Sequence, residues 1–473
     1  MHFNNVLKNG RCTQFVAANT VNILTISAGA SMAWSSPVLA KLTKDKSYSP
    51  FPRDITSPES MWMGALVSLG TAVGPFICAL STERIGMKRT LLLSALPSLF
   101  GWILTASATS IAQLLVARFI LGLACSVVFS VAPSYVSEIS DSKIRGTLGA
   151  LLQVTLTIGM LLAYCIGPYT SYVVFTSICG IIPLIFAVCF VFMPDSPYCC
   201  ASKGKLEEAR SCLVRLRDKA PDQIDEEVKQ IQAEVEADKN GSYRELLCSG
   251  TQNLPLFLGI GLAVFFQLSG VTAVLIYAET LFEKTASSMS PDIMAIIMGV
   301  VQTFAALITP FIFDRFGRKI LLIFSGVGMA VTMGTFGAYF YIIENKLINE
   351  ESLTYIPLGC IVGFIFTNSI GFGGAIWVVI SEIFPGHLRA FATAVCTSIC
   401  FVAAFIIALT FDDLERLLKS SGTFWLYAVF CALSAVFVEI FLPETRVSLP
   451  HQLWVMFLAQ CNPQDGFIVL YGK

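Results

Sequence analysis

Long apolar stretches recur along the whole chain, and they constrain the fold more than any other feature of the sequence. A helix needs about 20 mostly apolar residues to cross a lipid bilayer. Twelve such stretches cover roughly residues 15–36, 61–80, 90–108, 111–134, 147–167, 171–193, 254–279, 292–313, 320–342, 354–379, 391–410 and 424–442. Only 13% of the residues are charged, against about 25% in soluble proteins. The sequence therefore predicts an all-α membrane protein with twelve transmembrane helices.

One polar segment interrupts this pattern near the middle of the chain. Residues 203–245 hold 20 of the 63 charged residues, and their apolar residues repeat at helical spacing on both sides of Pro221. The segment reads either as a solvated linker or as a helical cap that covers the spans, and the apolar stripes favour the cap. The expected divisions are a six-helix half at 1–193, a cytoplasmic helical linker at 194–253, a second six-helix half at 254–442 and a tail at 443–473.

Basic residues are distributed unevenly between the predicted loops. If both termini face the cytoplasm, the inner segments hold 22 of the 31 Lys and Arg residues, the outer loops hold 8, and Arg118 lies inside a span. Cytoplasmic loops of membrane proteins carry this excess of positive charge. We therefore expect a multi-pass protein of the cell membrane with both termini in the cytoplasm.

Charged motifs occur twice in the same order, once in each half. The turn "ERIGMKR" is followed 231 residues later by "DRFGRK", "SEIS" is followed after 244 residues by "SEIF", and "PDSP" is followed after 249 residues by "PETR". Three ordered pairs at nearly constant offset indicate a parallel repeat of two six-helix halves. Gly86 and Gly317 would permit the tight turn between helices in the first pair.

The charged motifs all fall at the predicted cytoplasmic ends of spans. The residues concerned are Glu83, Arg84, Glu138, Arg145, Asp314, Arg315, Glu382, Arg389 and Glu444. Anchoring by positive charge explains the basic residues, but it does not explain the acids. We predict that these residues form a gate of ion pairs between the halves, closed when the protein opens outward and broken when it opens inward.

Taken together, the motifs resemble those of the sugar porter branch of the major facilitator superfamily. The resemblance covers residues 15–446 and is carried by the three motif pairs, by "PSYVSEI" and by "QLSG". Within this branch the chain is similar to insect facilitated trehalose transporters. The resemblance implies the major facilitator fold of two six-helix repeats, with a sugar site near the bilayer midplane between the halves.

The resemblance also implies which residues contact the sugar. These are Gln153, Gln267, Thr272, Gln302 and Trp377. Amides donate and accept hydrogen bonds with hydroxyl groups, and an indole can cover the apolar face of a sugar ring. Each amide also has a structural interpretation, because amides in spans often bond to a neighbouring helix.

Several positions depart from the pattern of glucose carriers. Phe266 replaces the first Gln of a Gln-Gln pair, Thr272 replaces an Asn, and Cys400 and Phe401 replace an Asn-Trp pair. The predicted site is therefore less polar than a glucose site, and whether it transports efficiently is left open. Trehalose and hexoses both remain candidate substrates.

Three functions fit the sequence, and an enzyme does not. A facilitative uniporter is expected first, a proton–sugar symporter second, and a non-transporting sugar sensor third. Proton-coupled relatives carry an acid in the first span after an aromatic residue, and this chain has Ser35 after Trp34. The spans carry no nucleophile–base pair and no metal-ligand spacing, so we expect no enzymatic activity and no cofactor. The expected partners are a sugar and the bilayer, with no nucleic acid, and the expected functional unit is a monomer.

Overall fold

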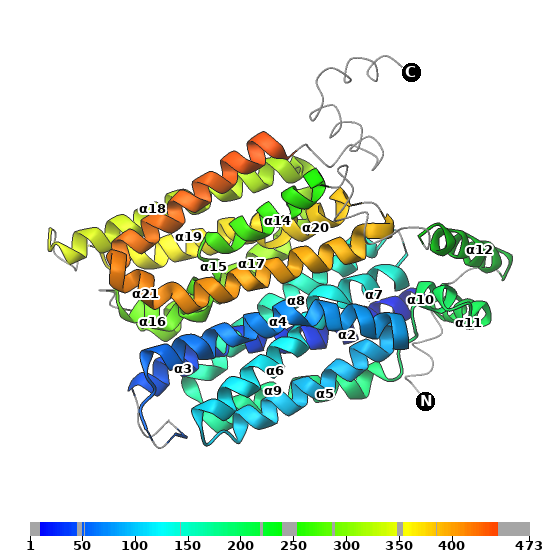
Figure 1. Ribbon diagram of the computed structural model, residues 1–473, viewed down its shortest axis with the longest axis horizontal. Coiled ribbons are helices and arrows are strands. Elements are labelled where there is room, and N and C mark those ends of the chain that lie inside the picture. The colour runs from blue at the N-terminus through cyan, green and yellow to red at the C-terminus, as the bar shows by residue number, and fades with distance from the viewer. Residues whose placement is uncertain are drawn as a thin grey trace, which may run out of the picture.

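The computed structural model describes residues 10–44, 50–51, 53–141, 143–217, 221–238, 253–285, 289–347, 353–384 and 386–442. The described residues form two groups of long helices that lie side by side (Figure 1). The first group comprises α2 (Gly10–Ala33), α3 (Ser35–Lys44), α4 (Ser57–Ile85), α5 (Met87–Ala106), α6 (Ile111–Ser130), α7 (Ala132–Ile139), α8 (Arg145–Ile166), the short 3-10 helix η1 (Gly167–Tyr169) and α9 (Tyr172–Phe190). The second comprises α14 (Asn253–Leu268), α15 (Val271–Ile276), α16 (Ala278–Glu283), α17 (Pro291–Phe316), α18 (Arg318–Glu344), α19 (Ile356–Ile370), α20 (Phe372–Ile383) and α21 (Gly386–Phe441).

These helices account for the twelve predicted spans. Within the described residues, ten helices are long and apolar enough to cross a membrane. The last of them, Phe391–Phe441, contains two spans, because the chain reverses at Lys419, where φ is 60° (Figure 1). The remaining span is the seventh, which is broken into α14, α15 and α16. The all-α, multi-pass membrane fold is therefore confirmed.

Glycines make the two tight turns that the repeat predicts. Gly86 joins α4 to α5 with φ 96°, and Gly317 joins α17 to α18 with φ 84°. Residues with a Cβ rarely adopt such positive φ values. The sequence prediction of permissive glycines at both turns is confirmed.

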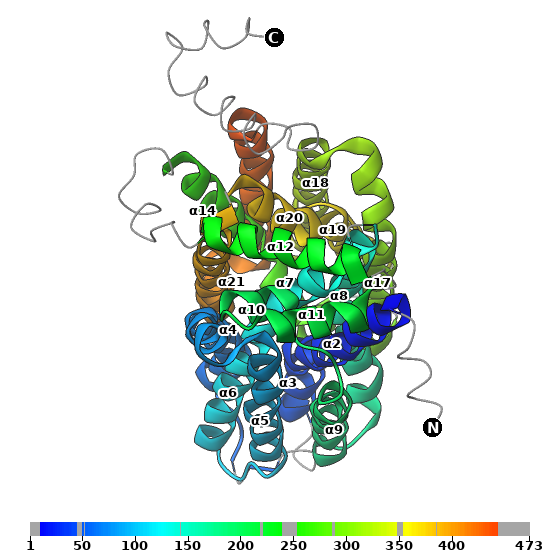
Figure 2. The same ribbon diagram turned by 90° about the vertical axis from the view of Figure 1, so that its right-hand side faces the viewer.

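The polar segment forms three short helices at one end of the bundle. These are α10 (Pro197–Ser202), α11 (Leu206–Leu216) and α12 (Pro221–Asp238). Their apolar stripes pack mainly against one another, in a small core that includes Leu213, Ile224 and Ile231. The stripes therefore cover one another more than they cover the spans, since three short amphipathic helices can bury their apolar faces among themselves. Figure 2 shows the three helices lying across the end of the bundle.

Arg217 attaches this helical cap to the first group of helices. Its side chain is 5% exposed and lies 3.0 Å from Asp141 and 3.0 Å from Glu227 on α12. It also donates a 2.8 Å hydrogen bond to the carbonyl of Ile139 at the end of α7. We call this end of the bundle the linker end and the opposite end, where α21 reverses at Lys419, the distal end (Figure 1).

Candidate functional site

A polar cluster lies where the seventh span breaks. Gln267, near the end of α14, is 3% exposed. Its side-chain oxygen accepts a 2.5 Å hydrogen bond from Thr272 on α15, and its amide nitrogen donates to the Sγ atom of Cys400 at 3.3 Å. Gly270 makes the break with φ 83°, and a Cβ there would lie 2.6 Å from the ring of Tyr427. The "QLSG" motif therefore positions two predicted site residues against each other and against α21.

An aromatic cluster lies next to this polar cluster and joins the two groups of helices. Phe129 on α6 contacts two aromatic rings of the second group. Its ring centroid is 4.9 Å from that of Phe401 on α21 and 6.2 Å from that of Trp377 on α20. Phe401 follows Cys400 directly, so the polar and aromatic clusters meet on one turn of α21. Amide and hydroxyl groups beside aromatic faces can bind a ligand that has both polar edges and apolar faces.

The other two predicted site residues lie apart from these contacts. Gln302 on α17 is 5% exposed, and its amide nitrogen donates to the Sδ atom of Met160 on α8 at 3.6 Å. Its side-chain oxygen is buried without a hydrogen-bond partner in the described residues, which suits a position that meets a polar ligand. Gln153 on α8 is partly exposed, and no hydrogen bond of its side chain is found in the described part of the chain.

Arg118 is the charged residue buried most deeply among the helices of the first group. Its side chain is fully buried and donates three hydrogen bonds: to the carbonyl of Met63 at 3.2 Å, to the carbonyl of Ser31 at 2.9 Å and to the hydroxyl of Ser35 at 2.7 Å. The guanidinium also lies 5.0 Å from the ring centroid of Trp34. Among the described residues, no carboxylate lies within ion-pair distance of Arg118. Its charge is therefore held by neutral acceptors and by an aromatic face.

Hydrogen bonds join the two groups of helices at the distal end. The hydroxyl of Ser57, at the start of α4, donates to Asp412 on α21 at 2.8 Å and accepts from Arg416 at 2.8 Å. The hydroxyl of Ser36 on α3 accepts from the backbone N–H of Glu279 on α16 at 3.2 Å. We call the Ser57–Asp412–Arg416 contact the distal latch, since it connects the first group of helices to the second.

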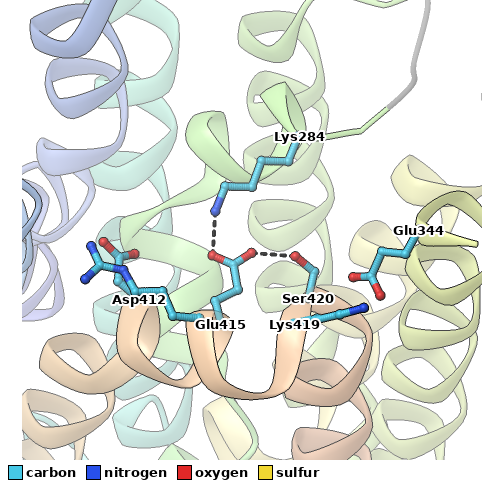
Figure 3. A pocket seen from close by; sticks show the side chains of 7 residues that line it. Lys284, Glu344, Asp412, Glu415, Lys419 and Ser420 are labelled. Atoms are coloured by element: carbon cyan, nitrogen blue, oxygen red, sulfur yellow. Dashed lines mark hydrogen bonds and ion pairs between the residues drawn. The ribbon is translucent and has the colours of Figure 1, made fainter.

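A charged cavity of about 580 Å³ lies beside the distal latch (Figure 3). Its lining residues are Lys284, Glu344, Asp412, Glu415, Arg416, Lys419 and Ser420. Figure 3 shows Glu415 between Lys284 and Ser420, and the side chain lies 2.5 Å from the first and 2.7 Å from the second. These contacts fix the reversal of α21 to the end of α16, and so hold Asp412 and Arg416 in place for the latch.

Two of the predicted gate acids lie at the linker end and bond to residues of their own half or of the adjoining helical cap. Glu382 on α20 lies 3.0 Å from Arg318 on α18. Glu138 on α7 accepts a hydrogen bond from the hydroxyl of Ser196, at the start of α10. These contacts order the charged ends of the helices but do not by themselves join the two groups.

The structure describes four further gate residues and leaves three undescribed. Glu83, Arg84, Arg145 and Arg315 are exposed at the linker end. Glu444 and the side chains of Asp314 and Arg389 lie outside the described residues. The ring of ion pairs between the halves stays a prediction.

Two residues of the site were not found from the sequence. Phe129 lies in an apolar span, where a phenylalanine has no pattern that separates it from residues facing lipid. Ser57 lies just before the second predicted span, 61–80, and begins α4 as an ordinary helix-start residue. In both cases only the contact with α21 reveals the role, and no local signal could have predicted it.

Known proteins resemble this chain over most of its length. The family model described as "Sugar (and other) transporter" matches residues 15–453. A facilitated trehalose transporter, Tret1, of Apis mellifera ligustica is 33% identical over 92% of this chain and 86% of its own length. Tret1 of Bombyx mori is 32% identical over 92% of this chain and 85% of its own.

Solved structures show the same fold. The proton:xylose symporter XylE bound to 6-bromo-6-deoxy-D-glucose, a major facilitator superfamily protein, superimposes with a TM-score of 0.78 at 22% identity, covering 94% of this chain and 99% of XylE. XylE from E. coli in a partially occluded inward-open conformation gives 0.77 at 21% identity, with 92% and 99% coverage. The twelve spans, the ordered motif pairs and the match across nearly the whole chain lead to one conclusion: the protein belongs to the sugar transporter family of the major facilitator superfamily.

Proposed function

We propose that the protein carries a neutral sugar, trehalose or a hexose, down its concentration gradient by alternating access. The observation that carries this proposal is the junction of Gln267 and Thr272 with the aromatic cluster, between the two groups of helices. The curated relatives at about one-third identity are named facilitated trehalose transporters. In this proposal the halves 1–193 and 254–442 rock around the site, while the linker 194–253 moves with the first half.

The surroundings of Arg118 support transport that is independent of protons. Proton coupling needs a group that faces the passage and changes protonation during the cycle. In the first span, Ser35 stands at the position where proton-coupled relatives carry an acid. Its hydroxyl does not titrate, and it accepts a 2.7 Å hydrogen bond from Arg118. The predicted sugar contacts are amides, a hydroxyl and an indole, which do not titrate either. A proton–sugar symporter and a non-transporting sensor are the alternative functions.

The proposed orientation places the linker end in the cytoplasm, at the plasma membrane, with the distal end outside. The excess of basic residues in segments predicted to lie at the linker end supports this orientation. The proposed functional unit is a monomer, since both halves of the site come from one chain.

Uptake by purified protein in lipid vesicles tests the proposal. We expect labelled glucose or trehalose to equilibrate across the membrane at the same rate with and without an imposed pH gradient, and never to accumulate. Accumulation that a proton ionophore collapses would establish the symporter instead. Repeating that experiment with Glu279→Gln would then show whether Glu279, a buried acid on α16, carries the proton. Sugar binding without uptake would establish the sensor.

We propose that the distal latch and the linker-end gate act in opposite states of the cycle. Ser57→Ala removes the hydroxyl that bonds both Asp412 and Arg416, so it should favour the state that is open at the distal end. Glu382→Gln removes one carboxylate of the predicted gate, beyond its ion pair with Arg318 inside the second group. If Glu382 also meets the first half when the linker end closes, as the gate prediction holds, the change should favour opening at the linker end. Hydrogen bonds to charged groups contribute about 1.5–3 kcal/mol, which corresponds to a shift of about tenfold or more in the conformational equilibrium.

The measurement is the labelling rate of a cysteine introduced in the passage, Ala404→Cys, in a protein whose 15 native cysteines have been replaced. An impermeant thiol reagent is added from one side of the membrane. Ser60→Ala is the matched control, because the Ser60 hydroxyl donates to the Ser57 carbonyl within α4 and not to α21. Equal labelling of Ser57→Ala and Ser60→Ala from the distal side would refute the latch. Unchanged labelling and transport in Glu382→Gln would remove this residue from the gate.

A further inference from the structure

We propose that Phe129 closes the passage between the two halves and thereby limits the size of the sugar that enters. The inference rests on the proposed function, and it concerns a residue of the first half for which the sequence predicted no role. It commits to a single sugar ring, as in a hexose, over a disaccharide as the preferred substrate.

Phe129 occupies the aromatic surface on which a sugar would stack. Carbon atoms in contact lie about 3.5–4.0 Å apart, so a sugar ring held between two aromatic rings needs about 7–8 Å between them. The Phe129 ring centroid lies 4.9 Å from that of Phe401 and 6.2 Å from that of Trp377. No sugar ring fits in either space, so a sugar that stacks on the side of Trp377 turned toward Phe129 must displace Phe129.

Phe129 is larger than the side chains that surround it from the first group of helices. Ala72 on α4 and Ala404 on α21 are 3% and 0% exposed and belong to the same apolar cluster as Phe401. Met32 on α2 packs against the same cluster. Two of these neighbours carry only a methyl group, and methionine adapts its shape readily. Phe129 is therefore the bulky side chain that the first group contributes here, and its ring together with that of Phe401 fills the space between α6 and α21.

The polar groups of the site are arranged on one side of this junction. On the α14–α15 side Thr272 donates to Gln267, and Gln267 donates to Cys400, whereas Phe129 meets the next residue, Phe401, from the opposite half. A single ring can bond the amide with its hydroxyl groups and place an apolar face on Trp377. The second ring of a disaccharide would have to take the place of Phe129, where the apolar cluster offers it no hydrogen bonds.

Uptake of labelled glucose and labelled trehalose by the wild type and by Phe129→Ala tests the size limit. We expect Phe129→Ala to raise the ratio of trehalose to glucose uptake by about tenfold or more, the scale on which pocket size discriminates between substrates. Phe129→Tyr keeps the ring and should keep the wild-type ratio. Phe304→Ala is the control for loss of a phenyl group, because Phe304 is 57% exposed on the outer surface of α17.

A second measurement does not depend on transport. Phe129→Ala should label Ala404→Cys at least several-fold faster with a small thiol reagent, since the ring that covers this position is gone. An unchanged labelling rate overturns the proposal, whatever the sugar uptake. Faster labelling with a trehalose-to-glucose ratio within about twofold of the wild type overturns the size limit. If the wild type carries neither sugar, the proposed function fails, and the labelling rate alone decides whether Phe129 closes the passage.

Discussion

Gly159→Val is expected to prevent α2 and α8 from packing together and to abolish both stable folding and transport. A Cβ atom at Gly159 would lie 2.1 Å from the carbonyl oxygen of Ile26 on α2. The glycine on the facing helix is equally close: a Cβ atom at Gly29 on α2 would lie 2.0 Å from the carbonyl oxygen of Leu156 on α8. Both obstructing atoms belong to helix backbones, which cannot turn aside as a side chain can. Small residues allow this close approach of helices in membranes, and overpacking costs about 1–3 kcal/mol or more.

The matched control for this variant lies on the same helix. A Cβ atom at Gly149 has no heavy atom within 4 Å, so Gly149→Ala should keep the melting temperature of the detergent-solubilised protein or raise it slightly. Gly159→Ala should lower the melting temperature, and Gly159→Val should leave little folded protein. Equal melting temperatures for Gly149→Ala and Gly159→Ala would contradict the close helix contact.

Arg118→Met is expected to destabilise the first half severely. The substitution removes three hydrogen bonds that connect α6 to α2, α3 and α4. Ser31 is among the last four residues of α2, whose carbonyl groups have no partner within the helix, so the arginine caps this helix where the chain passes into α3. Each hydrogen bond to a charged group contributes about 1.5–3 kcal/mol. We expect a loss of folded protein in detergent, together with a loss of uptake.

Arg53→Met provides the comparison with an exposed arginine. Arg53 forms an ion pair with Glu59, and its side chain is 59% exposed. Exposed ion pairs contribute about 0–1 kcal/mol, so this variant should melt close to the wild type. If Arg118→Met melted at the same temperature as Arg53→Met, the role of Arg118 as a buried helix cap would be wrong.

The sequence predicted the fold in detail because the bilayer restricts the possible structures. A span must satisfy its own backbone hydrogen bonds in lipid, so each long apolar stretch has to form a helix. The repeated motifs then ordered these helices into two halves, and the positive φ angles at Gly86 and Gly317 follow from the same motifs. The break at "QLSG" was not predicted, because residues 254–279 read as one apolar stretch, and neither was the contact of Thr272 with Gln267 that the break allows.

The sequence by itself therefore determined the twelve spans, the division by a helical linker and the family. Only the tertiary structure decided which residues meet at the junction of the halves. Phe129 and Phe401 are both apolar residues in apolar spans, and in lipid a helix can turn any apolar face outward or inward at little cost. Their meeting at 4.9 Å depends on the rotation of α6 and α21 about their axes. That rotation is set by close backbone contacts and by buried groups such as Arg118, which bond across the helices and leave no periodic pattern along the chain.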